Sequence, residues 1–346
     1  MKLRFLLIAF TLVTHLYGRS IFRAADPEEP TLIAQWVGDS KTYTFKNTHL
    51  EKEPLFKVFD KKQFFDHQLP VTPITFRYNT EQSVSGELLD QCIQTLLQEV
   101  KAGKTTFTHF DVLKKKDFNK QQQVGLLILK FKKYPFVVKL FLESPQSFVQ
   151  PFSKGFEPTC FFYMGGGVNR HISGFTRIKN LTFVQNKIKK HHYWSQKVDF
   201  PRKWFWYPKE SSWIQLTGKH IGETENIQTT FPAIYAIVAD QIIWTREFAL
   251  SDPKDRKTAM AISNFVDQRV DPHINNFGIE QNSGKIVPID FELFPLMVGL
   301  KQNNKPSGYA AWYTGLALKM VKDTFGRSKQ ERRNIQQNTI LSYLQD

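Results

Sequence analysis

The stretch DPHINNFGIEQNSGKIVPIDFE, residues 271–292, contains side chains that can bind a metal ion and accept a proton. Asp271, His273 and Asn276 stand within six positions, and Asp290 follows the apolar run KIVPI. FGI and KIVPIDF predict two short strands, and the letters NSG between them predict a turn. Such a hairpin places Asn276, which precedes its first strand, beside Asp290, which lies at the end of its second.

This arrangement suits phosphoryl transfer. An amide oxygen and a carboxylate together suit Mg²⁺, a hard cation that takes oxygen ligands and leaves room for phosphate and water. Asp271 on the same loop can accept the proton of an attacking hydroxyl, and positioning with charge neutralisation supplies nearly all of the catalysis in this chemistry. The alternative is structural, because Asp and Asn also serve in turns. Asp290 argues against it, since a carboxylate within an apolar segment is costly unless a cation or hydrogen bonds compensate it.

The order D-x-H-x-x-N, strand, turn and I-D-F resembles the catalytic and metal-binding loops of the phosphoinositide 3/4-kinase type of kinase-like fold. Related loops occur in actin-fragmin kinase and in HipA-type kinases. The usual pattern is D-R-H-x-x-N followed by H-I-D-F-G, so Pro272 and Glu292 depart from it. The ending with Glu292 resembles that of aminoglycoside-type phosphotransferases. The resemblance covers roughly residues 255–295, with a weaker match over 126–143.

The resemblance implies an α+β, bilobal kinase-like fold with a small, β-rich N-lobe. Its C-lobe would be reduced and mainly helical and would carry the catalytic hairpin. Asp271 would be the catalytic aspartate, and His273 would support the loop or assist proton transfer. Asn276 and Asp290 would be ligands of Mg²⁺, and ATP would be the phosphate donor.

The same resemblance assigns Lys139, in the run VVKLF, to the α- and β-phosphates of ATP. The expected partner of this lysine is Glu157, with Glu143 as the alternative. Before Lys139 the chain has the single glycine Gly125 where many kinases carry a glycine-rich loop. The run MGGGVNRH, residues 164–171, follows the lysine; we interpret it as a turn, with a phosphate-binding nest as the alternative.

Regular elements must position these residues. SGELLDQCIQTLLQEVKAG, residues 85–103, predicts a helix from Ser85 to before Gly103, with Cys92 buried on its apolar stripe. TTFTHFDVL, VGLLILKF and PFVVKLFLE predict successive strands, the last two joined by the turn KKYP. DPKDRKTAMAISNFVDQ predicts a helix that opens at Asp252-Pro253 and ends just before the catalytic loop.

The charge of the chain favours anionic partners. The formal net charge is +15 with an isoelectric point near 9.6, so polyanions and phosphate-bearing ligands are attracted. Residues 179–209 interleave basic and aromatic residues and are a candidate membrane surface. The expected partners are a nucleotide and either an anionic lipid head group or a protein substrate, with nucleic acid less favoured.

The N-terminus predicts export. Lys2 and Arg4 precede an apolar run that ends near Gly18, which is typical of a secretory leader over about residues 1–18. Ala24-Ala25 is a second cleavage candidate. We therefore expect a secreted or periplasmic protein, or one delivered into a host cell where ATP is present. The remaining divisions are an N-terminal extension over 19–82, an N-lobe with the basic and aromatic insertion over 83–235, and a C-lobe over 236–346.

Three functions follow from these patterns. The first is an ATP- and Mg²⁺-dependent kinase that transfers the γ-phosphate to a lipid or protein hydroxyl. The second is a catalytically inactive pseudokinase that acts by binding. The third is a non-enzymatic basic protein that binds a membrane surface or nucleic acid through residues 179–209.

Overall fold

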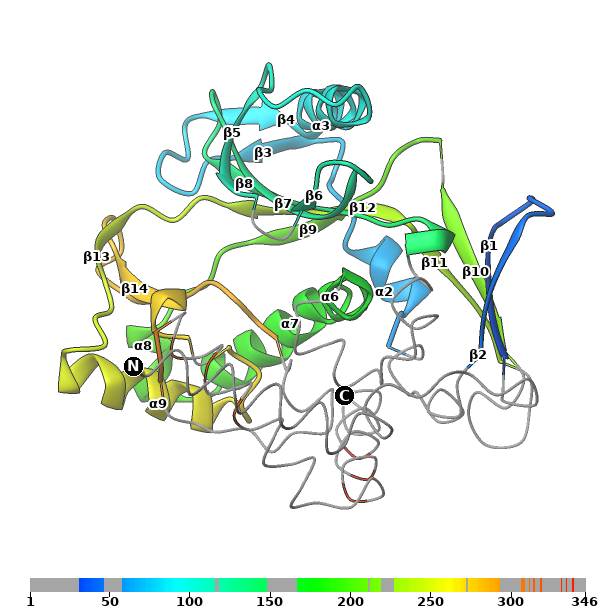
Figure 1. Ribbon diagram of the computed structural model, residues 1–346. Helices are drawn as coiled ribbons and strands as arrows, with labels where there is room; N and C mark the ends of the chain where they lie inside the picture. Colours follow the sequence, from blue (N-terminus) through cyan, green and yellow to red (C-terminus); the bar gives the residue numbers. More distant parts are fainter. Residues whose placement is uncertain are drawn as a thin grey trace, which may run out of the picture.

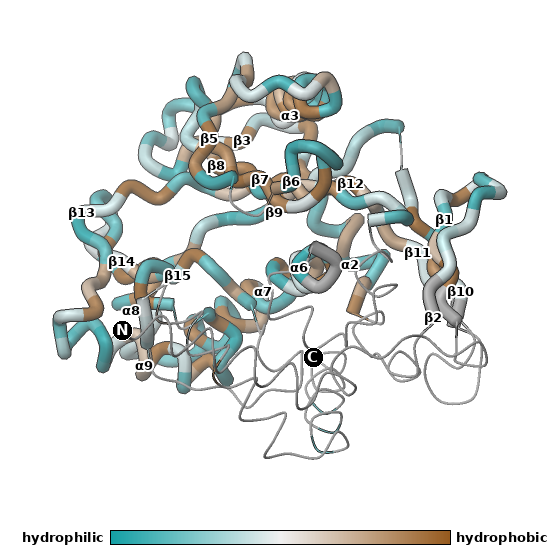
Figure 2. Tube along the Cα trace, viewed as in Figure 1, coloured by the Kyte–Doolittle hydropathy of each residue, from teal (hydrophilic) through white to brown (hydrophobic). Residues whose placement is uncertain are grey.

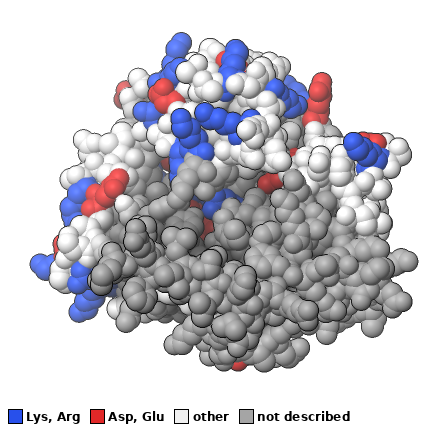
Figure 3. Space-filling view, in the orientation of Figure 1, with Lys and Arg blue, Asp and Glu red and all other residues white. Residues whose placement is uncertain are grey.

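The computed structural model describes residues 31–46, 58–115, 118–147, 167–210, 212–218, 227–271, 273–292 and 306–308, with single positions at 311, 314, 318, 331, 334 and 338. Within these ranges the protein belongs to the mixed α and β class, with several antiparallel sheets and few helices (Figure 1). Apolar residues concentrate in the strands of the largest sheet (Figure 2). Lys and Arg side chains gather on the surface around it (Figure 3).

The largest sheet carries Lys139 on an inner strand. Its path is β5-β7-β8-β12-β9, and β6 pairs with β7 at one end. All these pairings are antiparallel, and the register places Lys139 of β8 opposite Ile128 of β7 and Ile237 of β12. The strands are β5 (Phe110–Lys114), β6 (Phe118–Asn119), β7 (Val124–Phe131), β8 (Phe136–Leu142), β9 (Lys203–Trp206) and β12 (Ile234–Asp240).

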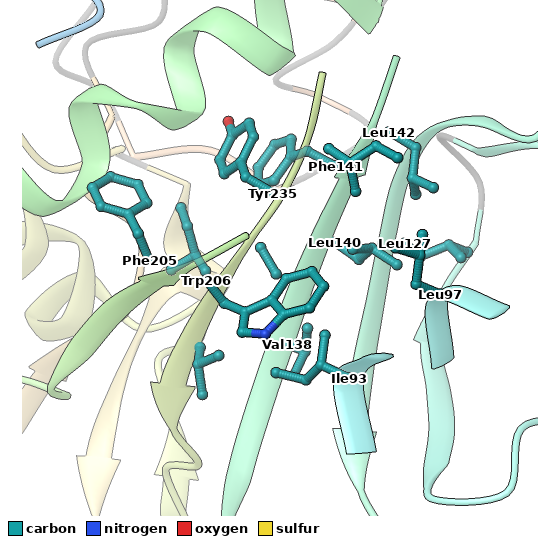
Figure 4. Packing of buried hydrophobic residues seen from close by; sticks show 14 of the residues in the cluster. Ile93, Leu97, Leu127, Val138, Leu140, Phe141, Leu142, Phe205, Trp206 and Tyr235 are labelled. Carbon is teal, nitrogen blue, oxygen red and sulfur yellow. The ribbon is translucent and has the colours of Figure 1, made fainter. Parts of the chain in front are cut away.

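The two faces of this sheet have different roles because side chains alternate along a strand. Val138 and Leu140 of β8 face helix α3 (Gly86–Lys101), against which Figure 4 shows them packing. Phe141, on the other face, stacks on Tyr235 with ring centroids 4.6 Å apart. Lys139 shares that second face, which is covered by α6 (Gly167–Gly174) and α7 (Thr176–Lys189).

Local sequence signals account for the elements around this sheet. The expected helix is α3, with Ser85 at its N-cap accepting a hydrogen bond from the backbone N–H of Glu87. Gly103 follows it with a φ of 72°, a conformation that favours glycine. Cys92 is buried as expected, whereas Cys160 lies outside the described residues. The strand expected over 105–113 is shorter than predicted, because β5 begins only at Phe110.

The N-terminal residues are integrated with later parts of the chain. β1 (Thr31–Trp36) and β2 (Thr42–Lys46) form a four-stranded antiparallel sheet with β10 (Trp213–Gly218) and β11 (Ile227–Pro232), in the order β11-β10-β1-β2. Helix α2 (Lys61–Asp66) and the pair β3 (Pro73–Thr75) and β4 (Ser83–Ser85) follow. The expected extension over 19–82 therefore contributes the strands β1, β2 and β3 and the helix α2, and β12 runs across the expected boundary between residues 235 and 236.

Helix α7 joins two hydrophobic clusters. The larger cluster contains the six-stranded sheet and α3, and the smaller one contains α9 (Pro253–Phe265) with Phe277 and Phe291. Ile178 of α7 belongs to the larger cluster, and Leu181, Val184 and Ile188 belong to the smaller. One helix therefore ties the sheet that bears Lys139 to the elements that bear Asp290.

The candidate catalytic loop lies between α9 and a hairpin. Asp252 caps α9 and Pro253 opens it, as the sequence predicts. The one-turn 3-10 helix η3 (Ile274–Asn276) leads into β14 (Phe277–Glu280), which pairs with β15 (Ile286–Pro288) as expected. β13 (Trp244–Glu247) adds a third strand on the other side of β14. Three strands thus stand beside α9 in the described part of the region expected to be mainly helical.

No helix within the described ranges is both long and apolar enough to cross a membrane. The leader expected over residues 1–18 and its cleavage site lie outside these ranges, and both stay predictions.

A partly buried ionic cluster joins residues 76–82 to the hairpin. Nε of Arg77 donates to Glu280 Oε1 at 2.6 Å, and Nη2 donates to Asp199 Oδ2 at 2.8 Å. The third donor of Arg77, Nη1, bonds the carbonyl oxygen of Phe200 at 2.7 Å. The Glu280 side chain is only 2% exposed, so its charge depends on this guanidinium.

We expect Arg77→Ala to lower the free energy of unfolding by about 3 kcal/mol, because it leaves the Glu280 carboxylate buried without its cation. Lys62→Ala is the matched control, since it removes an ion pair with Asp66 whose side chains are 85% and 50% exposed. Denaturant unfolding of both variants measures the difference. Equal midpoints for the two variants would contradict the role assigned to Arg77.

Candidate functional site

Lys139 and Asp290 meet although 151 positions separate them in the chain. Nζ of Lys139 donates to Asp290 Oδ2 at 3.1 Å, and the two side chains are 21% and 16% exposed. The lysine reaches this point from an inner strand of the six-stranded sheet, and the carboxylate follows the β14–β15 hairpin. The pair therefore joins the two segments that the sequence resemblance singled out.

The expected catalytic loop lies against the same segment. The backbone N–H of Asp271 donates to the carbonyl of Asp290 at 3.2 Å, and the N–H of Ile289 donates to the carbonyl of Asn276 at 2.9 Å. The side chains of Asn276 and Asp271 are hydrogen bonded to each other. Asp271, Asn276 and Asp290 are thus held together by main-chain bonds that the hairpin creates.

His273 stabilises this loop through its backbone. Its N–H donates to Asp271 Oδ1 at 3.2 Å, and the residue forms a parallel bridge with Ser307. The His273 side chain is buried, and burial, reinforced by the charge of Lys114, lowers the pKa of its imidazole. A neutral ring follows near neutral pH, which suits a residue that holds the loop.

Three further groups hold residues 289–292. Arg177, on the first turn of α7, forms an ion pair with Glu292, and its Nη1 lies 3.5 Å from Asp290 Oδ1. Asn180, one turn later, donates to the carbonyl of Phe291 at 3.1 Å. Lys203 of β9 donates from Nζ to the carbonyl of Ile289 at 2.8 Å.

The charge balance at this point is positive. Lys139, Arg177 and Lys203 face the carboxylates of Asp290 and Glu292. Burial alone would raise the pKa of Asp290, but the charges of these three cations overcome it and hold the pKa well below its usual range. The carboxylate of Asp290 is therefore ionised at any physiological pH.

The lysines respond in the opposite way. Burial, reinforced by the like charge of Arg177, lowers the pKa of Lys139 even though Asp290 is its partner. Burial and the nearby charge of Lys139 lower the pKa of Lys203 further. These crowded cations would gain from an additional anion such as a phosphate group.

Asp271 differs from Asp290 although both lie in this site. Burial, together with the negative charges of Asp290 and Glu292, raises the pKa of Asp271 to about 7. Hydrogen bonds from the His273 N–H and the Asn276 side chain only partly oppose this shift. Asp271 can consequently exchange a proton near neutral pH, as a general base requires.

The donor set is compatible with a hard cation. Asp290 Oδ1 is a buried oxygen without a hydrogen-bond partner, and Asn276 adds an amide to the same loop. Carboxylate and amide oxygens are ligands that Mg²⁺ accepts. Among the described residues no group of three His, Cys, Asp or Glu side chains gathers as a metal site, so a cation here would depend on substrate oxygens and water as well.

Two other predictions concern the glutamate partner of Lys139 and the glycine run at residues 164–171. Glu157, the expected partner of Lys139, lies outside the described residues. The alternative, Glu143, is buried at the end of β8, where its carboxylate accepts a hydrogen bond from Ser147 at 2.7 Å. The glycine run was interpreted as a turn, but its last residue, Gly167, begins helix α6; residues 164–166 lie outside the described part.

The sequence reasoning missed Arg177 and Lys203. Both lie in a stretch dense in lysine and arginine, in which their types do not distinguish them from surface residues. In the structure they are 4% and 8% exposed. The one available signal was the apolar spacing of α7, which turns Arg177 toward the same side as the buried Leu181 and Val184.

The basic and aromatic segment 179–209 is divided between surface and interior. Lys189 and Lys190 are exposed at the end of α7, and Tyr193 is exposed on α8 (His192–Lys197). Phe205 and Trp206 of β9 are buried, so the segment does not present all of its aromatic residues on one surface. The exposed basic and aromatic residues named here lie on or directly after α7 and on α8.

Comparison of the chain with models of known protein families, with curated proteins and with solved structures found no match.

Proposed function

We propose that this protein is an ATP- and Mg²⁺-dependent phosphotransferase with a kinase-like, bilobal arrangement of the sheet around Lys139 and the elements around Asp290. The observation that carries the proposal is the Lys139–Asp290 contact beside the Asp271–Asn276 loop. Residues that a kinase uses to hold phosphate, hold metal and accept a proton thereby share one site. The acceptor would be a lipid or protein hydroxyl.

The proposed step assigns one task to each side chain. The oxygen of the acceptor hydroxyl forms a bond to the γ-phosphorus, while the bond from that phosphorus to the β–γ bridging oxygen breaks. ADP leaves with the electron pair of the broken bond, and the hydroxyl proton passes to Asp271. Lys139 would pair with the phosphates of the donor, and His273 would hold the loop as a positioning residue.

Asn276 and Asp290 would hold Mg²⁺. The bound ion neutralises charge on the phosphate oxygens, which is its usual contribution to this chemistry. The ionised state of Asp290 and its buried oxygen without a hydrogen-bond partner support this assignment.

A second candidate is a pseudokinase that binds without catalysis. Arg177 favours it, because its guanidinium already lies 3.5 Å from Asp290 while Lys139 lies 3.1 Å away. Protein cations thus supply charge where a metal ion would act. The third candidate, a non-enzymatic basic protein on membranes or nucleic acid, uses none of the contacts around Asp290.

Thermal unfolding with ATP and Mg²⁺ tests nucleotide binding. We expect ligand at one hundred times its Kd to stabilise the parent by about 2.7 kcal/mol and to raise its melting temperature accordingly. Lys139→Met and Asp290→Asn are expected to lose this increase, each measured against its own unliganded melting temperature. Lys101→Met and Asp111→Asn remove the same charges at exposed positions of α3 and β5 and should keep it.

Incubation with ATP labelled in the γ-phosphate then distinguishes the candidates. Label transferred to a lipid, a protein or the chain itself supports the phosphotransferase. Stabilisation by nucleotide without transfer supports the pseudokinase. If ATP and Mg²⁺ do not stabilise the parent, both the phosphotransferase and the nucleotide-binding pseudokinase are contradicted. The non-enzymatic basic protein is then the favoured candidate.

A further inference from the structure

Glu292 stands where the sequence pattern that the chain resembles has a glycine, and the proposed phosphoryl transfer gives it no task. Its side chain is buried and forms an ion pair with Nη2 of Arg177. Asp290 lies two positions earlier, and its Oδ1 is 3.5 Å from Nη1 of the same guanidinium. One buried arginine therefore lies between two carboxylates, one of which is the proposed metal ligand.

The contacts of Arg177 with these two carboxylates are unequal. Nη2 donates a hydrogen bond to Oε2 of Glu292. Nη1 and Asp290 Oδ1 are both buried, and neither has a hydrogen-bond partner among the described residues. A buried donor and a buried acceptor left unbonded each cost free energy. The guanidinium would therefore gain by turning toward Asp290, and its contact with Glu292 opposes that movement.

The main chain on both sides of Asp290 is anchored. Lys203 donates from Nζ to the carbonyl of Ile289 at 2.8 Å, and Asn180 donates to the carbonyl of Phe291 at 3.1 Å. Asn180 lies one turn after the arginine on α7, so the helix and the segment that bears the carboxylates are joined. Rotation of side chains, without movement of the main chain, is then enough to decide which carboxylate the guanidinium bonds.

The two oxygens of Asp290 are engaged differently. Oδ2 accepts a hydrogen bond from Nζ of Lys139 at 3.1 Å, which leaves Oδ1 as the oxygen that a ligand can use. A hydrogen bond from Arg177 to Oδ1 would place a second cation on this carboxylate and would repel a metal ion. A guanidinium that is held by Glu292 leaves Oδ1 to the metal.

Arg177 keeps its charge in this environment. Burial alone would lower the pKa of its guanidinium, but the charges of Asp290 and Glu292 overcome this effect and raise the pKa above its usual range. The arginine is consequently a permanent competitor for the oxygens of Asp290. Loss of its proton cannot remove this competition, whereas a second carboxylate within reach can.

We propose that Glu292 is a positioning residue that holds the guanidinium of Arg177 away from Asp290 and so keeps Asp290 available to a divalent cation. The proposal rests on the metal site assigned to Asp290 in the proposed phosphotransferase. Glu292 itself neither binds the ion nor moves a proton. Without it, Arg177 would bond Asp290 and exclude the ion.

Thermal unfolding at a fixed concentration of AMP-PNP, over a series of Mn²⁺ concentrations, tests this role. Each variant is compared with its own melting temperature without ligands. We expect Glu292→Gln to need about tenfold more Mn²⁺ than the parent, or still more, to reach half of the increase in melting temperature, because Arg177 then competes for Asp290. Arg177→Met/Glu292→Gln should need no more Mn²⁺ than the parent, because the competing cation is absent.

Glu99→Gln is the matched control. It makes the same change at a buried carboxylate of α3, on the opposite face of the large sheet, where Lys104 and Thr108 are the partners. The Mn²⁺ dependence of this variant should equal that of the parent. A weakening in Glu292→Gln that the control does not share, and that Arg177→Met reverses, is the result expected of a positioning residue.

If Glu292→Gln does not fold, Arg177→Met and the double variant still decide the question, because neither should need more Mn²⁺ than the parent. A folded Glu292→Gln with the Mn²⁺ dependence of the parent would overturn the proposal, and so would a double variant that stays weak. Either result, with a parent that responds to Mn²⁺, leaves the proposed phosphotransferase intact. A parent that does not respond to Mn²⁺ and AMP-PNP would contradict the metal site itself, and the proposal with it.

Discussion

Replacing Asp290 with asparagine is expected to lower the free energy of unfolding by roughly 3 to 5 kcal/mol near neutral pH. The substitution keeps the shape of the side chain but removes its charge. Among the described residues, Glu292 would then be the carboxylate that remains against the buried Lys139, Arg177 and Lys203. Uncompensated buried cations are among the costliest defects in a protein interior.

Denaturant unfolding measures this loss, and a double-mutant cycle assigns it. Lys139→Met/Asp290→Asn should be less destabilised than the sum of the two single variants, because removing both charges leaves neither unpaired. The loss in Asp290→Asn should also shrink in acid. The lowered pKa of Asp290 gives stability that is present above its unfolded value of about 3.9 and disappears as the pH falls through the folded value. A variant as stable as the parent would refute the charge network.

Asp271→Asn is expected to have the opposite effect on stability. Because burial and neighbouring carboxylates raise the pKa of Asp271 to about 7, the folded protein holds a proton there that the unfolded chain releases near pH 3.9. The stability of the parent therefore falls between these two values as the pH rises, and the full cost is reached above pH 7. Asparagine does not titrate and avoids this cost.

The free energy of unfolding of Asp271→Asn is expected to exceed that of the parent by roughly 2 to 4 kcal/mol above neutral pH, and by little near pH 4. The lower end of this range reflects the partial exposure of Asp271. Asp290→Asn is the matched control, since it changes a carboxylate of the same site with the opposite pKa shift. We compare the free energy of unfolding of each variant with that of the parent as a function of pH. If this difference changes in the same direction with pH for both variants, these assignments are contradicted.

The same substitution should abolish most of the proposed activity. Removal of a general base costs about a hundredfold to ten-thousandfold in rate, and the rate of the parent should rise as the pH passes through the pKa of Asp271. If Asp271→Asn is more stable than the parent above neutral pH yet inactive, the carboxylate of Asp271 lowers the stability of the folded protein and is required for its activity. Full activity in Asp271→Asn would remove this residue from the mechanism but would leave the stability argument intact.

Much of the local structure was predictable because the signals are short-range. Apolar spacing and capping residues predict α3 and α9, and alternation with the NSG turn predicts the β14–β15 hairpin. The hairpin in turn predicts that Asn276 lies beside Asp290. The position of Lys139 rested on a resemblance, and the sheet register then shows how the lysine reaches that point.

Long-range features were not predictable in the same way. Nothing local in TLIAQW indicates that β1 pairs with β10, which lies far along the chain. Burial of Arg177 and Lys203 depends on which helix face and which strand face meet residues 289–292. A single sequence gives residue types but not these partners, so buried cations within a basic segment resemble surface ones.

The position of Asp290 and Glu292 late in the chain affects the order in which parts of the protein can fold during synthesis. Lys139, Arg177 and Lys203 are all synthesised well before Asp290 and Glu292 leave the ribosome. Until then, packing α7 against the face of the sheet that bears Lys139 would bury three cations without counter-charges, which is unfavourable. We therefore expect that face to stay exposed to water until Asp290 and Glu292 have been synthesised. A chain truncated before residue 290 would lack the carboxylates that allow this face to be buried.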